Sequence, residues 1–184
     1  MSDTFPLLDL TLPSHAPELL KDYHKKCTFD EASVAIYSLV PDMTFERVQQ
    51  IASMPQQEWE DYEMETQLVR PAKPTPIFAG GKLVDIVHAH AAMDKEVSPP
   101  RSSGTSDIGW LPHCFVVITN NNLDDHGLLF VYADKITDED GNFAPMGKFF
   151  FKPEKMFTML SGLILGGPEF PLMKRYHDMD EKKD

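Results

Sequence analysis

The chain of 184 residues carries 29 acidic and 17 basic side chains, which gives a formal net charge of −12 at pH 7. A strongly negative surface repels nucleic acids and anionic lipids and attracts basic proteins. We therefore exclude nucleic acids and membrane surfaces as expected partners and favour a basic protein. The length predicts one domain over 1–184, and the composition, with 42% hydrophobic and 25% charged residues, is typical of a globular protein.

The cysteine content and the N-terminus indicate a cytoplasmic protein. Cys27 and Cys114 are too few for a disulfide framework and fit a reducing compartment, although a single bridge between them stays an open alternative. Residues 1–6 lack the basic and apolar regions of a signal peptide. The apolar run 156–165 is shorter than the roughly 20 residues that a membrane-spanning helix needs.

In the first part of the chain, apolar periodicity and capping residues predict three helices, over about 14–26, 45–52 and 56–67. Thr44 is the expected N-cap of the second helix. Between the first two helices, Ser33–Val40 is apolar on both alternating faces, which is typical of a central strand. A proline-rich connector over 71–76 is expected to be extended.

In the second part, we expect four strands, over 82–91, 114–119, 128–133 and 148–151. Turn residues separate these runs at 80–81, 120–127 and 138–142. Residues 95–109 are expected to form a flexible loop. A closing helix is predicted over 153–165, and a charged tail that frays at its end is predicted over 171–184. This order predicts an α+β domain with a mainly antiparallel sheet covered by helices.

His88 and His90 are weak candidates for metal ligands. Alternate residues of a strand point to the same side, so both imidazoles could reach one ion if 82–91 is a strand. Asp94, His113 or Asp125 could then supply a third ligand. The alternative is that both histidines lie on a solvent-facing strand surface, and we predict no cofactor. A small metal-dependent enzyme is the second functional hypothesis.

Two other groups of residues suit catalysis but have simpler explanations. Asp125 and His126 could form a general base oriented by a carboxylate, yet the surrounding Asn, Asp and Gly residues are those of an ordinary turn. Cys114 could be a nucleophile beside His113 or His126, yet its apolar neighbours favour a buried structural thiol. We therefore assign no catalytic residue.

The acidic segment Glu58–Glu65 is the strongest functional candidate. Carboxylates that alternate with aromatic residues can bind the lysines and arginines of a protein partner. The expected contact residues are Glu58, Trp59, Glu60, Asp61, Tyr62, Glu63 and Glu65, with a second patch at Asp124 and Asp125. The alternative is a solvated helix in which Trp59 and Tyr62 pack inward.

Two parts of the chain resemble bacterial toxin-immunity proteins of the SUKH superfamily and the related GAD-like type. The first comprises Leu12–Tyr23 and Val34–Pro41, and the second comprises Phe115–Asn120, Asp125–Tyr132 and Pro153–Leu165. The glycine-rich turn that usually follows the first helix is absent, and Gly80–Trp110 has no counterpart. The resemblance implies a single-domain cytoplasmic protein that blocks a cognate toxin, often a nuclease, by placing its acidic face in the basic cleft of the toxin.

Overall fold

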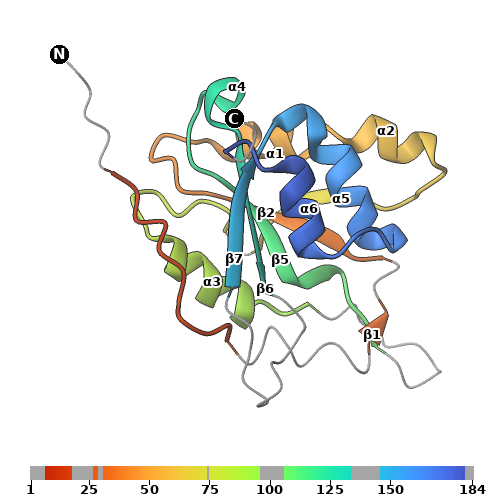
Figure 1. Cartoon of the computed structure of the whole chain (residues 1–184), viewed down its shortest axis with the longest axis horizontal. Helices are drawn as coiled ribbons and strands as arrows, with labels where there is room; N and C mark the ends of the chain where they lie inside the picture. The colour runs from red at the N-terminus through yellow and green to blue at the C-terminus, as the bar shows by residue number, and fades with distance from the viewer. Residues whose placement is uncertain are drawn as a thin grey trace.

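A five-stranded sheet forms the centre of the computed structural model, which describes residues 7–17, 27–28, 31–73, 75–95, 106–133 and 146–180 (Figure 1). The strand order is β3–β2–β5–β6–β7. These strands are β2 Ser33–Ser38, β3 Val69–Pro71, β5 Trp110–Ile118, β6 Leu128–Ala133 and β7 Met146–Phe151. A separate parallel pair joins β1 Cys27–Thr28 to β4 Ser106–Asp107.

The sheet is mixed. β2 pairs in parallel with β3 on one side and with β5 on the other, whereas β5–β6 and β6–β7 are antiparallel. The predicted α+β class is confirmed, and the antiparallel arrangement holds for the C-terminal half of the sheet. Every residue of β2 is buried, as its apolar sequence on both faces predicts.

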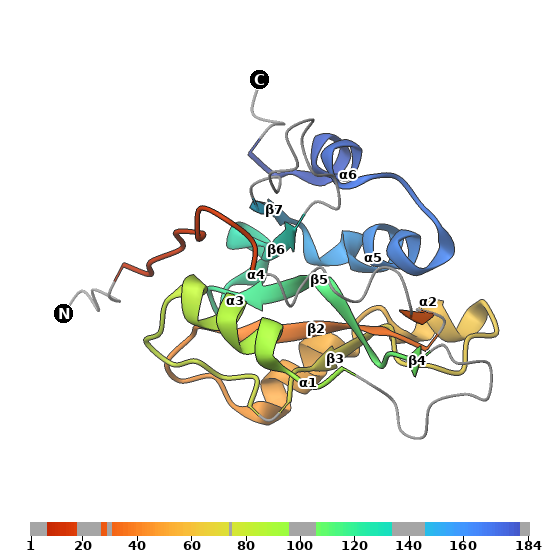
Figure 2. The ribbon, with the colours of Figure 1, turned by 90° about the horizontal axis from the view of Figure 1, so that it is seen from below.

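Helices cover both faces of this sheet. They are α1 Phe45–Ala52, α2 Gln56–Asp61, α3 Leu83–Ala92, α4 Leu123–His126, α5 Met156–Leu165 and α6 Phe170–His177, with a 3-10 turn, η3 Pro153–Lys155, before α5. Figures 1 and 2 show α3 on one side of the sheet and α1, α2, α5 and α6 on the other. The described part of the chain is therefore a three-layer arrangement.

Strand alternation divides the apolar side chains between two cores. Val34 and Ile36 of β2 face the core that contains α1, α2, α5 and α6. Ala35, Tyr37 and Leu39 face the core that contains α3 and the apolar side chains of the N-terminal segment, residues 7–17. Each core is continuous across β2, β5, β6 and β7, so these strands hold the helical layers together.

The connections around β2 reverse direction. The chain leaves β2 through α1 and α2 and returns as β3 on one side; it then leaves through α3 and returns as β5 on the other side. These two crossings use opposite faces of the sheet. The chain leaves β5 differently, through α4, and returns antiparallel as β6.

Most predicted elements are confirmed. The helix at 45–52 is present, and the backbone N–H of Arg47 donates to Thr44 Oγ1 at 3.2 Å, as expected for an N-cap. The strands predicted at 33–40, 114–119, 128–133 and 148–151 correspond to β2, β5, β6 and β7, and the closing helix corresponds to η3 and α5.

The strand predicted over 82–91 is wrong, because these residues form α3. Leu83, Ile86, Val87 and His90 recur at helical spacing and are buried against the sheet. The carboxylate of Asp85 accepts from the backbone N–H of Lys82 at 3.2 Å, which fixes the first turn. An almost uninterrupted apolar run is compatible with the period of a strand as well as that of a helix, and packing on the sheet selected the helix.

Three smaller differences concern the ends of elements. α2 ends at Asp61, earlier than predicted, and Glu63 then adopts a left-handed φ of 60°. A short α4 interrupts the turn predicted at 120–127, and α6 occupies part of the predicted tail. Most of the predicted first helix and loop, at 18–26 and 96–105, and the turn at 138–142, lie outside the described residues.

Gly127 allows the C-terminal segment, residues 178–180, to pack on the sheet. It has a φ of +70°, and a Cβ there would lie 2.6 Å from the Phe151 carbonyl oxygen and 2.4 Å from Met179 Sδ. The backbone N–H of Met179 donates to the Phe150 carbonyl oxygen at 2.8 Å, which ties the segment to β7. Any side chain at 127 would force these groups apart.

We expect Gly127→Ala to lower the free energy of unfolding by at least about 2 kcal/mol, because a left-handed backbone and a steric clash add together. Urea denaturation would measure the loss. Gly80→Ala is the matched control, since Gly80 has a φ of +69° but a Cβ at this position would meet nothing within 4 Å. Equal losses for the two variants would show that the contact with Met179 and Phe151 has no energetic consequence.

Candidate functional site

The acidic surface is formed by α2 and the residues that follow it. Glu58, Glu60, Asp61, Glu63 and Glu65 are all exposed. Gln56 and Gln57 each donate to a carboxylate one turn later, Gln56 Nε2 to Glu60 Oε1 and Gln57 Nε2 to Asp61 Oδ1, both at 3.2 Å. These contacts orient two of the carboxylates on one short helix without neutralising their charge.

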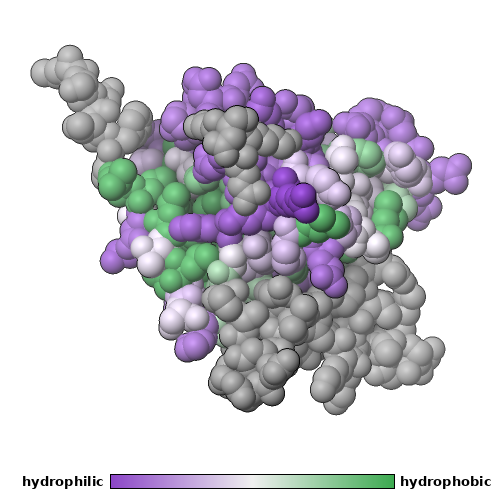
Figure 3. All heavy atoms as spheres, viewed as in Figure 1, coloured by the Kyte–Doolittle hydropathy of each residue, from purple (hydrophilic) through white to green (hydrophobic). Residues whose placement is uncertain are grey.

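Within the described ranges, no basic side chain pairs with these carboxylates. The chain has no Lys, Arg or His between Arg47 and Arg70. Among the residues that the structure describes, none forms an ion pair with the five carboxylates. Figure 3 shows hydrophilic surface at the upper right, in the region of α2, and hydrophobic surface at the left, over the N-terminal segment. The negative potential over α2 is therefore available to a partner.

The two aromatic residues of the segment have different environments. Tyr62 is 62% exposed, and its ring lies 5.5 Å from that of Phe157 on α5. Trp59 is fully buried, and its Nε1 donates to Thr66 Oγ1 at 3.3 Å. The prediction that Trp59 contacts a partner is therefore corrected: its indole belongs to the core, and Tyr62 is the exposed aromatic residue.

The histidines proposed as metal ligands point in different directions. Residues two apart on a helix are separated by roughly 200° around its axis, so α3 turns His88 toward solvent and His90 into the core. Asp94 and Asp125 do not complete a site with them, because no group of three or more His, Cys, Asp or Glu residues in the described ranges could hold a metal ion. Cys114 is buried in the core.

His90 instead joins α3 to both central strands. His90 Nε2 donates to the Leu111 carbonyl oxygen at 2.9 Å, so Nδ1 accepts from the Tyr37 hydroxyl at 2.8 Å. Burial is the main reason that the pKa of His90 falls to about 3, with the nearby charge of Lys95 acting in the same direction. Burial also raises the pKa of Tyr37. This pair is a neutral, buried connection within the fold.

Lys95 binds the end of α3 from the interior. Its Nζ donates to the carbonyl oxygens of His90 and of Met93, the latter at 3.0 Å. Burial lowers the pKa of Lys95 to about 8, against the opposing effect of Asp94. An ammonium group at helix carbonyls opposes the negative end of the helix dipole, so Lys95 has a structural role here.

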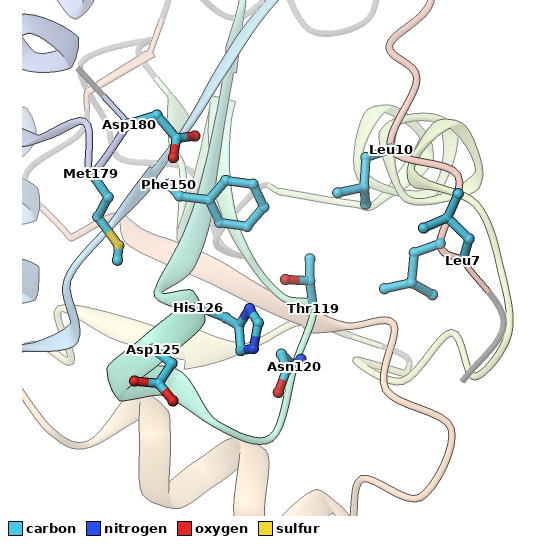
Figure 4. Close-up of a pocket in the computed structure, with 10 residues that line it drawn as sticks. Leu7, Leu10, Thr119, Asn120, Asp125, His126, Phe150, Met179 and Asp180 are labelled. Carbon is cyan, nitrogen blue, oxygen red and sulfur yellow. The ribbon is translucent and has the colours of Figure 1, made fainter. Parts of the chain in front are cut away.

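A hollow of about 510 Å³ opens at the carboxyl end of β5 (Figure 4). The loop after β5 supplies Thr119 and Asn120, and α4 supplies Asp125 and His126. The other lining residues are Leu7, Leu8, Leu10, Phe150, Met179 and Asp180. A smaller hollow of about 210 Å³ adjoins it and includes Val40 and Pro41, which follow β2.

The acidic pair of the predicted second patch is divided between two surfaces. Asp125 lines the hollow beside β5, whereas Asp124 lines a different depression together with Arg47 and Pro153. Asn122 fixes the loop: its Nδ2 donates to Asp125 Oδ2 at 2.7 Å, and its Oδ1 accepts from the backbone N–H of Asp125 at 3.2 Å. The two neighbouring carboxylates are both exposed on α4 and line different depressions.

A third hollow, of about 530 Å³, lies beside the edge strand β3 and contains Arg70. This side chain is already engaged: Arg70 Nε donates to Ser33 Oγ at 2.8 Å, and the guanidinium carbon lies 4.0 Å from the centre of the Trp110 ring. A second donor binds the Gly109 carbonyl oxygen. The arginine therefore connects β3 to the starts of β2 and β5.

Comparisons with known proteins found no matching family model, no matching curated protein and no matching solved structure. The resemblance to toxin-immunity proteins stays a prediction. Among the described residues, no helix has the length and apolar character needed to cross a membrane.

Sequence reasoning missed the hollow beside β5 because its walls come from distant parts of the chain. The sequence indicates the polar wall, because Asp125 and His126 are adjacent in an Asn-rich turn and suit a catalytic pair. The sequence does not indicate the apolar wall, because Leu10, Phe150 and Met179 meet only through tertiary packing. Lys148 of β7 helps to hold this wall, because its Nζ donates to the Leu10 carbonyl oxygen.

The burial of the two aromatic residues predicts different losses of stability. We expect Trp59→Ala to lower the free energy of unfolding by about 3–5 kcal/mol, because it leaves a cavity in the core. Tyr62→Ala should cost about 1 kcal/mol or less, since the ring is largely exposed and loses mainly its contact with Phe157. Chemical denaturation would measure both. Similar losses would contradict the assignment of Tyr62 to the surface.

The buried His90 predicts a loss of stability in acid. The unfolded chain protonates His90 near its ordinary pKa of 6.5, whereas the folded protein does so only near 3. The free energy of unfolding should therefore fall as the pH decreases from about 6.5 toward 3, with a His90 contribution of up to about 1.4 kcal/mol per pH unit.

Urea denaturation across this pH range would measure that contribution as the difference in slope between the wild type and His90→Gln. His88→Gln is the matched control because His88 is exposed on the same helix, and it should keep the wild-type slope. A His90→Gln variant with an unchanged slope would contradict the buried neutral imidazole.

Proposed function

We propose that this protein binds a basic protein partner through the α2–α5 surface, defined here as the exposed carboxylates Glu58, Glu60, Asp61, Glu63 and Glu65 together with Tyr62 and Phe157. The observation that carries the proposal is the unbalanced charge of this surface. Five exposed carboxylates and an exposed aromatic ring lie in one short segment, and no described basic side chain pairs with the carboxylates.

The physical chemistry of this surface suits a lysine- or arginine-rich partner. Negative charge accelerates encounter with a positive surface and rejects acidic competitors. Tyr62 offers an aromatic ring that can contact aliphatic chains or stack with a guanidinium group, and aromatic residues of this kind are common at the centres of interfaces. The partner would thus be held by charge around an aromatic contact.

The class of partner follows from the resemblance to toxin-immunity proteins. On that basis, the protein neutralises a cognate bacterial toxin or effector in the cytoplasm by occluding its active site. A nuclease is the favoured target because its substrate cleft must be basic to bind a phosphate backbone. The mechanism is steric and electrostatic, and it requires no cofactor.

Paired affinity captures from the native host, with wild-type protein and a charge-reversal variant as baits, would test the proposal. The wild type should retain a basic protein in near-stoichiometric amount at low salt and lose it at high salt. Immunity further requires that purified bait inhibit the toxicity of that captured protein. Capture of an acidic protein, or of a basic protein that is insensitive to salt, would contradict the proposal.

We expect the double substitution Glu60→Lys with Asp61→Lys to weaken binding of the captured partner by at least about tenfold, because two attractive contacts become repulsive. Titration calorimetry would measure the change. Asp42→Lys with Glu169→Lys is the control of equal charge: both side chains are exposed, Asp42 precedes α1, and Glu169 precedes α6 without a side-chain capping bond. Equal weakening by both variants would indicate a net-charge effect and would remove α2 as the contact.

A further inference from the structure

We propose that the hollow beside β3 binds a small organic acid, with its carboxylate on the guanidinium group of Arg70 and its apolar body against Phe45. The hollow has a volume of about 530 Å³, which lies within the range of small-molecule pockets. Its lining shares no residue with the α2–α5 surface. This proposal therefore does not depend on the proposed function.

Arg70 has donors that the fold does not use. Its Nε donates to Ser33 Oγ at 2.8 Å, and its Nη2 donates to the Gly109 carbonyl oxygen. The two acceptors lie together, because the backbone N–H of Ser33 itself donates to the Gly109 carbonyl oxygen at 3.0 Å. They therefore occupy the edge of the guanidinium that Nε and Nη2 form, and they leave the edge that Nη1 and Nη2 form.

This second edge is open to a ligand. Within the described ranges, Nη1 of Arg70 has no hydrogen-bond partner and is not a buried atom. The side chain that carries it lines the hollow. An edge with two coplanar N–H groups matches the two oxygens of a carboxylate, and bidentate pairs of this kind are among the strong hydrogen bonds in proteins.

No described carboxylate balances the charge of Arg70. The side chain is half-buried, and charges withdrawn from water are usually paired with an opposite charge. Burial lowers the pKa of Arg70 for the same reason, and no described acid opposes this effect. Glu31, Glu46 and Glu65 lie in neighbouring parts of the chain, but none of them lines the hollow. A bound carboxylate would supply the missing negative charge.

The remainder of the lining favours an acid with an apolar body. The ring of Phe45 is 48% exposed and offers an apolar surface to a ligand. Lys73 is exposed and adds a second positive charge, whereas the other polar side chains of the lining, Gln49 and Gln67, are neutral. An amine would meet repulsion from both cations without a compensating carboxylate.

The guanidinium group is held in position by the fold. Its central carbon lies 4.0 Å from the centre of the Trp110 ring. Ser33 Oγ, which accepts from Nε, also donates to the Gln67 carbonyl oxygen. The helix that supplies Phe45, α1, lies beside β3 (Figure 2). A donor that is oriented in advance loses less entropy when a ligand binds.

Titration of the full-length chain with four matched probes would test the chemistry: 3-phenylpropionate, 3-phenylpropionamide, 2-phenylethylamine and 2-phenylethyl phosphate. The carboxylate should bind with one-to-one stoichiometry and at least about tenfold more tightly than the amide or the amine. An equally tight amide, or no binding of the carboxylate up to about 5 mM, would overturn the proposal. Tighter binding of the phosphate ester would assign the site to phosphate and overturn the carboxylate.

Two exposed residues of the lining would test the location. Phe45→Ala and Lys73→Gln should each weaken binding of 3-phenylpropionate by about threefold or more, through lost apolar contact and lost charge respectively. Lys82→Gln is the matched control for charge, because Lys82 is also exposed and lies outside the lining. It should change the affinity by less than about twofold. Equal losses in Lys73→Gln and Lys82→Gln would indicate a long-range charge effect and overturn the site.

Arg70→Lys would test the anchor itself. It keeps a positive charge but cannot present two coplanar donors, so it should weaken binding of 3-phenylpropionate by about tenfold or more. An unchanged affinity would overturn the proposal.

Two measurements on the wild type keep the test decisive if Arg70→Lys folds poorly. Addition of 3-phenylpropionate should shift the indole N–H signal of Trp110 in NMR spectra and leave that of the buried Trp59 unchanged. A shift of the Trp59 signal alone would overturn the site. Acetyl-alanyl-phenylalanine presents the same carboxylate at the end of a peptide. If it binds at least about tenfold more tightly than 3-phenylpropionate, the hollow receives the C-terminus of a protein, and the small-acid proposal is wrong.

Discussion

The burial of β2 on both faces is the constraint on which the rest of the structure depends. A strand that is apolar on both sides and parallel to both neighbours must be covered by two helical layers. The chain meets this requirement by sending α1 and α2 to one face and α3 to the other. The placement of the acidic surface and of the buried His90 connection follows from that division.

The polar groups inside the protein serve the same constraint. His90 hydrogen-bonds to Tyr37 of β2 and to the Leu111 carbonyl oxygen of β5. One neutral imidazole on α3 therefore links three elements. Lys95 donates to carbonyl oxygens at the end of α3. Arg70 donates to Ser33 at the start of β2 and stacks on Trp110 at the start of β5. His90, which the sequence suggested as a metal ligand, therefore acts as a structural connection in the fold.

The two proposed binding surfaces differ in origin. The α2–α5 surface is largely local, because its carboxylates lie in one continuous segment and only Phe157 comes from elsewhere. The hollow beside β3 is assembled from α1, β3 with the residues on either side of it, and the start of β5. A local surface tolerates change in the remainder of the fold, whereas the hollow requires distant segments to keep their register.

The sequence by itself determined the class of fold, the central position of β2, the capped helix at 45–52 and the acidic character of α2, because each of these follows from a local pattern of apolar, capping or charged residues. Only the tertiary structure decided that 82–91 is a helix, that Trp59 lies in the core and that His88 and His90 point apart. Packing between residues far apart in the chain chose among conformations that the local pattern allowed equally.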